Sequence, residues 1–340
     1  MYNMVSVIIP TYKRANYIER AINSVLAQTY TDYEIIIVDD NDHNTEDRKI
    51  LENIMNKDGY KNNSKIKYIQ HDKNRNGAAA RNTGLKVSKG EYVTFLDDDD
   101  LFFKDRLEIL VKSLDENPEY NAAYTGCLIC KNGYIKSYKN ALKSGDLQKD
   151  TLMQNSFFGT GSNMFFRKKS LEDINGFDET FKRHQDLEVF VRYFRDNKIL
   201  AINEILVIKD NDSRINSPNI ERSLEYREYY MQKFIDDIQI YSDNKDIYIS
   251  NYFELLCNAV RANNKEYKNI IEKKLNTYTK LTTNMKLKLM YSRFDKYIPF
   301  KGSLRYIKNK KICNKINKAK LNEFEQLINN NHVKGIEKNG

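Results

Sequence analysis

The chain has 340 residues, of which 40% are hydrophobic, including 24 Tyr and 16 Phe. It can therefore bury one large or two ordinary cores, and global disorder is excluded. No apolar run approaches the roughly 18 residues of a transmembrane helix. Because the N-terminus also enters a strand pattern without a charged leader or cleavage site, we expect a cytoplasmic protein. The net charge of +9 is local: 13 Lys or Arg and one acid lie from Lys280 to Lys320, which makes this segment +12 and the rest of the chain −3.

The first 117 residues alternate between strand and helix patterns. Short, continuously apolar runs predict four buried strands, at residues 5–9, 34–38, 65–69 and 92–96. Apolar residues at helical spacing predict helices between them, at residues 17–28, 50–55 and 77–88. Buried strands joined by helices form parallel sheets that are covered on both faces, and ligands bind at the carboxyl ends of such strands. The sequence therefore predicts an α/β fold with a mostly parallel sheet.

The rest of the chain divides into a mixed part and a helical part. More scattered strand signals follow from 122 to 210, with strands expected at 162–166 and 206–209 and a helix at 185–196. From about Asn219 the pattern is helical throughout, and the polar segment 211–218 ends in a proline, which marks a boundary. We expect an α/β domain over 1–215, with halves 1–117 and 118–215, and a helical, basic domain over 216–340.

The four cysteines predict no metal site. Cys127 and Cys130 are spaced C-x-x-C, but no second pair follows, and a zinc site needs about four ligands. The surrounding segment reads as a strand, which would send the two side chains to opposite faces. We expect ordinary reduced thiols.

Four consecutive aspartates, Asp97, Asp98, Asp99 and Asp100, directly follow the predicted strand at 92–96. Like charges repel, so several carboxylates converge at the end of a buried strand only if a positive group binds them. Carboxylate oxygens are hard ligands that suit Mg²⁺ or Mn²⁺. The alternative is an acidic turn that caps the next helix, expected at 104–117. Four acids after one strand favour the metal site.

Six motifs in chain order resemble glycosyltransferase family 2, whose members have the GT-A fold. They are VSVIIPTY at 5–12, IVDD at 37–40, NGAAARNTG at 76–84, GEYVTFLDDDD at 90–100, GFDE at 176–179 and QD at 185–186. The resemblance covers roughly residues 4 to 212. It implies an inverting, metal-dependent hexosyl- or N-acetylhexosaminyltransferase of the kind that builds bacterial cell-surface polysaccharides. The donor would be a nucleotide-sugar, expected to be UDP-linked, with nucleotide binding in the half 1–117 and acceptor binding in the half 118–215.

The first two motifs are expected to bind the nucleotide. Pro10, Thr11 and Tyr12 form a turn whose backbone and aromatic face can hold a nucleobase, although a plain strand-ending turn would look the same. By resemblance, Asp39 or Asp40 accepts the N3–H of a uracil-like base. The alternative for one of the two is a helix N-cap.

The next motifs are expected to bind the diphosphate and its metal. Arg81 would contact the nucleotide or phosphate, or form a structural salt bridge to the aspartates. By resemblance, Asp99 binds Mn²⁺ or Mg²⁺ directly, Asp98 contacts the ribose or supports the ligands, and Asp97 ligates or orients. Asp100 most resembles a cap for the following helix.

Asp186 is the expected general base, which would deprotonate the acceptor hydroxyl. The family usually has Glu-Asp where this chain has Gln185-Asp186, and the structural alternative for Asp186 is an acid favoured by the helix dipole. Asp210 or Asp212 could replace a histidine metal ligand of the family. The segment 159–162 resembles the acceptor-side loop, although its glycines could equally be plain turn formers.

The basic segment 280–320 interleaves Lys and Arg with aromatic and aliphatic residues. This pattern suits an anionic membrane surface, or equally a solvated helix face. The family's acceptor is often a lipid-linked saccharide, so we expect peripheral attachment to the inner face of the cytoplasmic membrane and no nucleic-acid partner. Two other functions remain open. One is a nucleotidyltransferase, which would be expected to have a glycine-rich loop after the first strand, where this chain has PTYKR at 10–14. The other is a non-catalytic sugar-nucleotide-binding or scaffold protein.

Overall fold

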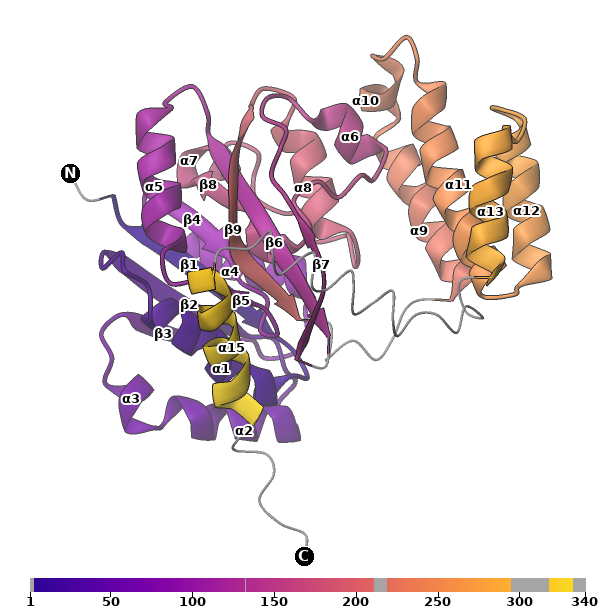
Figure 1. The fold of residues 1–340 in the computed structure, drawn as a ribbon. Helices are drawn as coiled ribbons and strands as arrows, with labels where there is room; N and C mark the ends of the chain where they lie inside the picture. The colour runs from indigo at the N-terminus through magenta and orange to yellow at the C-terminus, as the bar shows by residue number, and fades with distance from the viewer. Residues whose placement is uncertain (1–2, 132, 211–218, 295–317, 333–340) are drawn as a thin grey trace, which may run out of the picture. The chain divides into compact units, whose positions relative to one another are not determined.

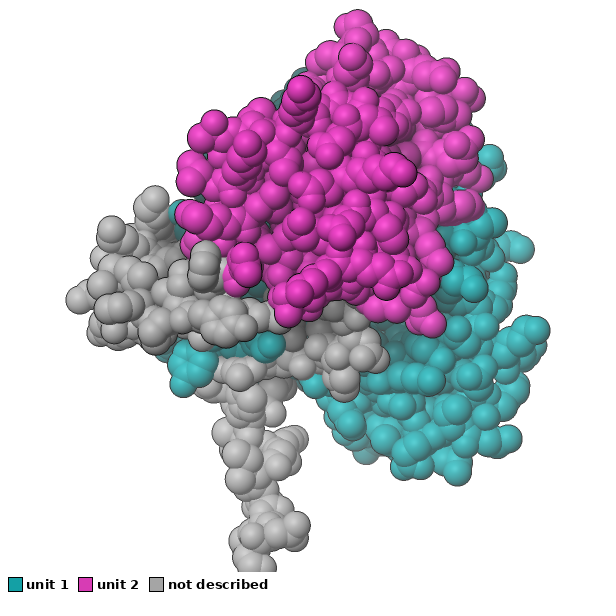
Figure 2. Space-filling model, turned by 90° about the vertical axis from the view of Figure 1, so that its right-hand side faces the viewer, with its two compact units in different colours: residues 1–147, 157–213, 309–340 teal, residues 148–156, 214–308 magenta. Residues whose placement is uncertain are grey.

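The computed structural model describes residues 3–131, 133–210, 219–294 and 318–332 (Figure 1). The chain forms two compact units (Figure 2). Unit 1 comprises residues 1–147, 157–213 and 309–340, and unit 2 comprises 148–156 and 214–308. The expected boundary at 211–218 lies outside the described residues. Two segments depart from the expected division, because 148–156 belongs to the helical unit and the C-terminal helix belongs to the α/β unit.

Unit 1 is built on one mixed sheet of nine strands in the order β3-β2-β1-β4-β8-β6-β9-β5, with β7 paired to β6. The strands β1 to β4 pair in parallel, β8 runs antiparallel to β4 and β6, and β9 runs parallel to β6. Their bounds are Val5–Thr11, Tyr33–Asp39, Ile66–Gln70, Tyr92–Phe95, Leu101–Phe102, Ala122–Lys131, Tyr134–Lys139, Phe165–Arg167 and Ile199–Asp210. The predicted parallel half and mixed half are both confirmed, and the short strands β5 and β7 are additions.

Helices cover this sheet, as expected from the alternating pattern (Figure 1). Those of unit 1 are α1 (Ala15–Leu26), α2 (Glu46–Met55), α3 (Asp58–Lys61), α4 (Gly77–Val87), α5 (Arg106–Glu116), α7 (Lys168–Glu172), α8 (Gln185–Tyr193) and α15 (Lys318–His332). The predicted helices at 17–28, 77–88 and 185–196 match α1, α4 and α8 within three residues at each end.

The core of unit 1 lies on both faces of the sheet. Cys127 and Cys130 are both fully buried and belong to two different hydrophobic clusters, which fits their expected positions on opposite faces of β6. The second cluster includes Phe324 and Ile328 of α15, so a helix about 200 residues further along the chain completes this part of the core. Lys320 of α15 also forms a salt bridge with Asp105.

Arg106 is one of the largest fully buried side chains among the described residues, and it fixes the segment before β8. Its guanidinium donates to Thr125 Oγ1 at 2.9 Å, Asn163 Oδ1 at 3.1 Å and the Ser162 carbonyl at 3.4 Å, and it lies 4.5 Å from the ring centre of Phe102. Burial lowers the pKa of Arg106 to about 9. These contacts tie residues 162–163 to β5 and β6.

Unit 2 is helical, as predicted for the chain after Asn219. Its described helices are α6 (Gln148–Leu152), α9 (Ile220–Lys233), α10 (Ile235–Gln239), α11 (Lys245–Arg261), α12 (Lys265–Asn276) and α13 (Thr283–Phe294). The α6 segment joins this unit through Tyr230, which donates to the Thr151 carbonyl at 2.9 Å, and Asn251, which donates to the Leu152 carbonyl at 2.9 Å. Within the described parts of the chain, no helix is both long enough and apolar enough to span a bilayer.

The close packing of α4 on β1 gives the first prediction. A Cβ at Gly84 would overlap Ile8 Cγ2, so Gly84→Ala should lower the free energy of unfolding by about 1–3 kcal/mol through overpacking. Urea unfolding measures this change. Gly59→Ala in α3 is the control, because nothing lies within 4 Å of its added Cβ. Equal stability of the two variants would contradict this packing.

Candidate active site

The aspartate run lies at the carboxyl end of β4, in the middle of the sheet. Asp98, Asp99 and Asp100 are 1–4% exposed, while Asp97 is partly exposed. One carboxylate oxygen from each of Asp97, Asp99 and Asp100 lies within 4.8 Å of the other two. We call these three residues the aspartate cluster. Buried carboxylates this close repel one another strongly, so their geometry depends on the groups that surround them.

Positive and hydroxyl groups from three other segments hold the aspartate cluster. Arg81 of α4 contacts Asp97 at 2.6 Å, and Arg14, just before α1, contacts Asp99 at 2.7 Å. The hydroxyls of Thr160 and Ser162 donate to Asp100 Oδ2 at 2.7 and 2.6 Å. The backbone amide of Asp210 donates to the other oxygen of Asp100 at 3.1 Å. This set of contacts fixes the side chains around a common point.

The prediction that Asp100 caps the next helix is wrong. Helix α5 begins at Arg106, and its N-cap residue is Asp105. Asp100 is instead buried, and both of its carboxylate oxygens accept hydrogen bonds from the Thr160–Ser162 turn and from β9. The short strand β5 and a turn at 104–105 separate Asp100 from α5, and the side chain of Asp100 belongs to the aspartate cluster instead.

Asp98 points to the first strand rather than into the cluster. Thr11 Oγ1 donates to Asp98 Oδ2 at 2.7 Å, and Arg14 lies 3.6 Å from Asp98 Oδ1. Burial, followed by the negative charge of Asp99, raises the pKa of Asp98 to about 8, although Arg14 opposes the shift. Burial and the charges of Asp99 and Asp97 likewise raise the pKa of Asp100 to about 7.

The donor set of the aspartate cluster fits a hard divalent cation. It offers three carboxylate oxygens close enough to share one ion, and carboxylates are the preferred ligands of Mg²⁺ and Mn²⁺. Burial and repulsion from Asp99 and Asp97 raise the pKa of Asp100, and a cation would offset the repulsion. The expected ligand Asp99 belongs to this cluster, together with Asp97 and Asp100.

Asp210 lies beside the cluster but is bound differently. Its carboxylate pairs with Arg20 at 2.8 Å, and the same guanidinium donates to the Asp99 carbonyl at 2.7 Å. Asp210 is therefore not among the three acids that converge. Asp212, the other expected replacement for a histidine ligand, lies outside the described residues.

The carboxyl ends of β1 and β2 hold the residues expected to bind the nucleobase. Thr11 is buried, while Pro10 and Tyr12 are partly exposed, and Lys13 lies 5.0 Å from the ring centre of Tyr12. Asp39 is fully buried; its carboxylate accepts a hydrogen bond from the Tyr68 hydroxyl at 2.6 Å and forms an ion pair with Arg48 at 2.9 Å. In the fold, Asp39 therefore links β2 to β3 and to α2.

Asp40 anchors the loop that leads into α4. Its carboxylate accepts from His71 Nδ1 at 2.7 Å and from the backbone amides of Arg75 and Asn76 at 2.8 and 3.0 Å. Asn76 is the N-cap of α4 and has a φ of 85°, a conformation that the bonds to Asp40 stabilise. Asp40 thereby sets the position of the helix that carries Arg81.

Helix α8 brings Asp186 to the same edge of the fold. Gln185 Oε1 accepts from Arg81 at 2.9 Å, and the same guanidinium contacts Asp97, so Arg81 joins the first turn of α8 to the aspartate cluster. Asp186 follows directly, partly exposed in the first turn of α8, with Oδ1 accepting from the Leu187 amide at 3.0 Å. The sequence pattern at 185–186 and the run at 97–100 are thus linked through one arginine.

The next turn of α8 has a structural pairing. Arg192 pairs with Glu188 at 2.5 Å and donates to the Gly176 carbonyl at 2.6 Å. Glu188 also accepts from the Asp178 amide at 3.1 Å. These bonds tie the GFDE motif at 176–179 to α8 and orient the helix that carries Asp186.

Sequence reasoning missed four residues that shape the site: Arg14, Arg20, Thr160 and Ser162. Arg14 and Arg20 lie about 80 residues before the aspartates they contact, and Thr160 and Ser162 lie about 60 residues after them. The only sequence signal for Thr160 and Ser162 was that the segment 159–162 resembles the acceptor-side loop of the family. Instead of forming a plain turn, this segment is hydrogen-bonded to Asp100.

The fold and the site together define an α/β protein with a cation-binding carboxylate cluster at the carboxyl end of a central strand. A family model described as Glycosyl transferase family 2 matches residues 6–175, which are half of the chain. The chain therefore belongs to glycosyltransferase family 2.

Two relatives and one solved structure support this assignment. An uncharacterized glycosyltransferase of Rickettsia conorii is 44% identical over 144 residues, 42% of this chain and 22% of that protein. The GalNAc(5)-diNAcBac-PP-undecaprenol beta-1,3-glucosyltransferase of Campylobacter jejuni is 33% identical over 180 residues, 52% of this chain and 55% of that protein. The chain thus spans from about a fifth to about half of the length of these relatives.

The solved structure is that of S. aureus TarS 1–349 in complex with UDP-GlcNAc. Its sequence is 19% identical to this one. The structural alignment covers 85% of this chain and 87% of the TarS chain, with a TM-score of 0.58. At this identity the likeness concerns the fold, and it confirms the predicted α/β class with a helical C-terminal region.

The raised pKa values of Asp98 and Asp100 predict how stability depends on pH. In the unfolded chain both carboxyl groups have the ordinary pKa of 3.8, so they keep their protons to a higher pH in the folded chain than in the unfolded chain. The folded state then binds more protons between about pH 4 and pH 8, so its stability falls as pH rises through this window. The chelator-treated protein should have a higher Tm at pH 6 than at pH 8.5.

The matched variant is Asp98→Asn, which removes one of the two titrating groups. Its Tm should depend less on pH than that of the wild type, as measured by thermal unfolding in the same buffers. Parallel pH profiles for the two proteins would contradict the raised pKa of Asp98.

Proposed function

We propose that the chain is an inverting, metal-dependent glycosyltransferase that moves a sugar from a nucleotide-sugar, expected to be UDP-linked, to a hydroxyl of a glycan or lipid-linked saccharide. The observation that carries this proposal is the link from the aspartate cluster through Arg81 to Gln185, next to Asp186. The cluster supplies ligands for a cation, Arg81 supplies a positive charge, and Asp186 supplies a partly exposed carboxylate. These are the groups that sugar transfer from a diphosphate requires.

In this proposal, Asp99 holds Mn²⁺ or Mg²⁺ together with Asp97 and Asp100. The cation, when bound, neutralises the charge that develops on the diphosphate leaving group. The rigid contacts of Arg14, Thr160 and Ser162 keep the three carboxylates in place, so little reorganisation is needed. Asp98 supports the ribose side of the donor site through Thr11, at the end of β1.

Asp186 acts as the general base. As the acceptor oxygen attacks the anomeric carbon, its proton passes to the Asp186 carboxylate, and the bond from the anomeric carbon to the diphosphate breaks. Attack on the face opposite the leaving group inverts the anomeric configuration. The Gln185–Arg81 bond and the Glu188–Arg192 pair hold the first turns of α8, so they position this carboxylate.

The nucleotide would lie over the carboxyl ends of β1 and β2. Pro10 and Tyr12 are partly exposed there and can face a base. Asp39 and Asp40 already accept hydrogen bonds from within the chain, so a uracil contact needs a further lone pair of one carboxylate. The donor sugar is expected to be a hexose or an N-acetylhexosamine, and the Campylobacter jejuni relative is named as a glucosyltransferase.

That relative is also named for an undecaprenol-linked acceptor, which supports a lipid-linked acceptor and a peripheral place on the inner membrane face for this chain. Most of the basic segment 280–320 lies outside the described residues, but helix α13 is described. Three of its side chains, Leu287, Met290 and Tyr291, are 54–60% exposed at i, i+3 and i+4 spacing. The helix carries Lys and Arg and no acid, as an amphipathic helix on an anionic lipid surface requires.

Replacement of the base tests the proposed chemistry. Asp186→Asn should lower the turnover of the accepted donor by a factor of about 100 or more, with its Kd for the donor nearly unchanged, because the side chain acts on the acceptor proton. The assay is nucleotide release from UDP-, GDP- and dTDP-sugars with and without Mn²⁺, with a candidate acceptor present. Asp115→Asn, far along the chain at the end of α5, is the control.

Full activity of Asp186→Asn would remove Asp186 as the base. If the wild type binds no donor and releases no nucleotide, the proposed enzyme activity is wrong and a non-catalytic function is favoured. Nucleotide release that does not depend on added cation would contradict the proposed metal dependence.

The membrane proposal predicts binding to anionic vesicles. The wild type should co-sediment with vesicles of phosphatidylglycerol at low salt and less with phosphatidylcholine alone, since the attraction is partly electrostatic. Leu287→Asp/Met290→Asp should weaken this binding about tenfold. Ile240→Asp is the matched control, because Ile240 is 70% exposed in unit 2 but lies outside α13. Equal loss in both variants, or no binding by the wild type, would contradict the assignment of α13.

A further inference from the structure

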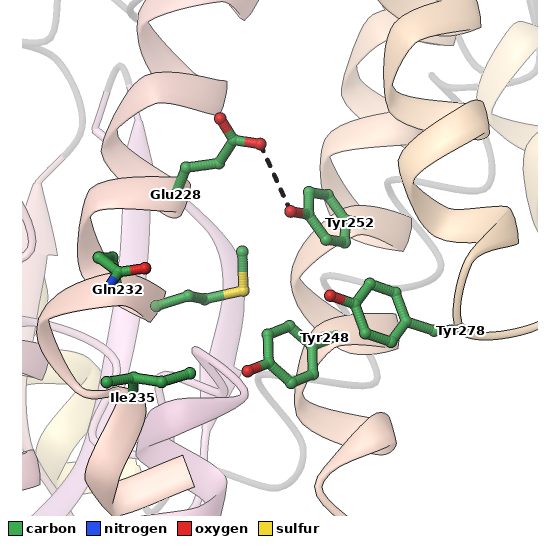
Figure 3. Close-up of a pocket in the computed structure, with 7 residues that line it drawn as sticks. Glu228, Gln232, Ile235, Tyr248, Tyr252 and Tyr278 are labelled. Carbon is green, nitrogen blue, oxygen red and sulfur yellow. Dashed lines mark hydrogen bonds between the residues drawn. The ribbon is translucent and has the colours of Figure 1, made fainter. Parts of the chain in front are cut away.

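A cavity of about 300 Å³ lies within the helical unit (Figure 3). Its walls come from α9, α10 and α11 and from the turn after α12. The lining residues are Glu228, Met231, Gln232, Ile235, Tyr248, Tyr252 and Tyr278. None of them takes part in the candidate active site. The volume is at the lower end of the range for small-molecule sites.

Three tyrosine rings form one wall of this cavity. Tyr248 and Tyr278 stack with their ring centres 4.6 Å apart and their planes 4° apart, and Tyr252 lies 6.0 Å from Tyr278 at 22°. The hydroxyls of all three point toward α9, across the cavity (Figure 3). Because the rings already pack against one another, they leave no slot for a planar base to enter between them.

The opposite wall is polar and electrically balanced. Glu228 accepts from the Tyr252 hydroxyl at 3.4 Å and pairs with Lys274 at 2.5 Å. In the described part of the chain, the Gln232 amide and the hydroxyls of Tyr248 and Tyr278 have no hydrogen-bond partner, so they are available to a ligand. The cavity thus combines aromatic carbon surface with several uncommitted hydrogen-bonding groups.

These features select the ligand by chemistry. Lys274 next to Glu228 disfavours a cation, and the carboxylate of Glu228 disfavours a phosphate. A neutral sugar ring fits, because its C–H face packs on aromatic carbon and its hydroxyls both donate and accept hydrogen bonds. We propose that the cavity binds one neutral sugar unit of the acceptor glycan, which rests on the proposed glycosyltransferase function for the source of that sugar.

A site of this kind would act on acceptor binding alone. All seven lining residues belong to unit 2, whereas the aspartate cluster and Asp186 belong to unit 1. Hydrolysis of the donor by water should therefore not depend on the cavity. The KM for an acceptor of several sugar units should depend on it.

Saturation-transfer NMR on the full chain tests the proposal. The probes are the methyl β-glycosides of glucose, galactose, N-acetylglucosamine and N-acetylgalactosamine, with UDP and Mn²⁺ present to occupy the donor site. At least one glycoside should receive saturation from the wild type. Gln232→Ala/Tyr248→Phe should weaken that binding about tenfold, because it removes two uncommitted hydrogen-bonding groups and keeps the ring stack.

Tyr229→Phe is the matched control, because it removes a hydroxyl from a 45% exposed tyrosine on the same helix as Gln232. It should bind the glycoside as the wild type does. Equal binding by the double variant and the control, or no binding of any glycoside by the wild type, would overturn the proposal. If the double variant has a lower Tm, Tyr278→Phe alone replaces it, with a loss of about fivefold expected.

A second readout separates this proposal from the proposed function. The same preparations are assayed for donor hydrolysis, which should be equal in the wild type and the double variant. Asp186→Asn should keep the glycoside signal. Glycoside binding by a wild type that neither binds a donor nor releases nucleotide would support the sugar site and contradict the enzyme, whereas donor hydrolysis without glycoside binding would contradict the sugar site alone.

Discussion

The close approach of the carboxylates after β4 is the constraint on which the rest of the site depends. Two unit charges about 5 Å apart repel by about 3 kcal/mol at an effective dielectric constant near 20. The aspartate cluster places three carboxylate oxygens within 4.8 Å of one another, two of them on buried residues. Two arginines, Arg14 and Arg81, and the hydroxyls of Thr160 and Ser162 offset part of this repulsion. Burial, together with the remaining repulsion from Asp99 and Asp97, raises the pKa of Asp100. A bound cation would offset that remaining part.

The sheet order explains why these groups can meet. β4 lies between β1 and β8, so the loop after β1 supplies Arg14 and the turn before β8 supplies Thr160 and Ser162. The β9 strand brings the Asp210 amide to the same point. Buried Arg106 fixes the turn before β8 from the other side, through the Ser162 carbonyl. The site is therefore built on rigid elements, and its helical neighbour α8 is attached through Arg81.

Local patterns in the sequence were sufficient for the parallel half of the fold and for the position of the aspartate run, because buried strands and amphipathic helices leave periodic signals. The role of Asp100 was predicted wrongly, because a capping argument uses only neighbouring residues, whereas its partners lie about 60 and 110 residues away. The same limit applies to Arg14 and Arg20, whose partners are also distant in sequence. It applies to helix α15 as well, because its sequence does not show which part of the core its apolar face contacts. The strand β5 has only two residues, which are too few to show a period. The family resemblance supplied the role of Asp186, which its position in the first turn of α8 alone does not distinguish from a helix-dipole acid.

The central claim is that the aspartate cluster holds the catalytic cation. The most direct measurement is an anomalous difference map from crystals grown with Mn²⁺ and UDP, collected near the manganese absorption edge. The account predicts one strong peak within about 2.5 Å of the Asp99 carboxylate, close to Asp97 and Asp100 and next to the diphosphate, and no such peak in Asp99→Asn crystals. UDP bound at the carboxyl ends of the strands with no manganese at the cluster, or with manganese held elsewhere, would contradict it.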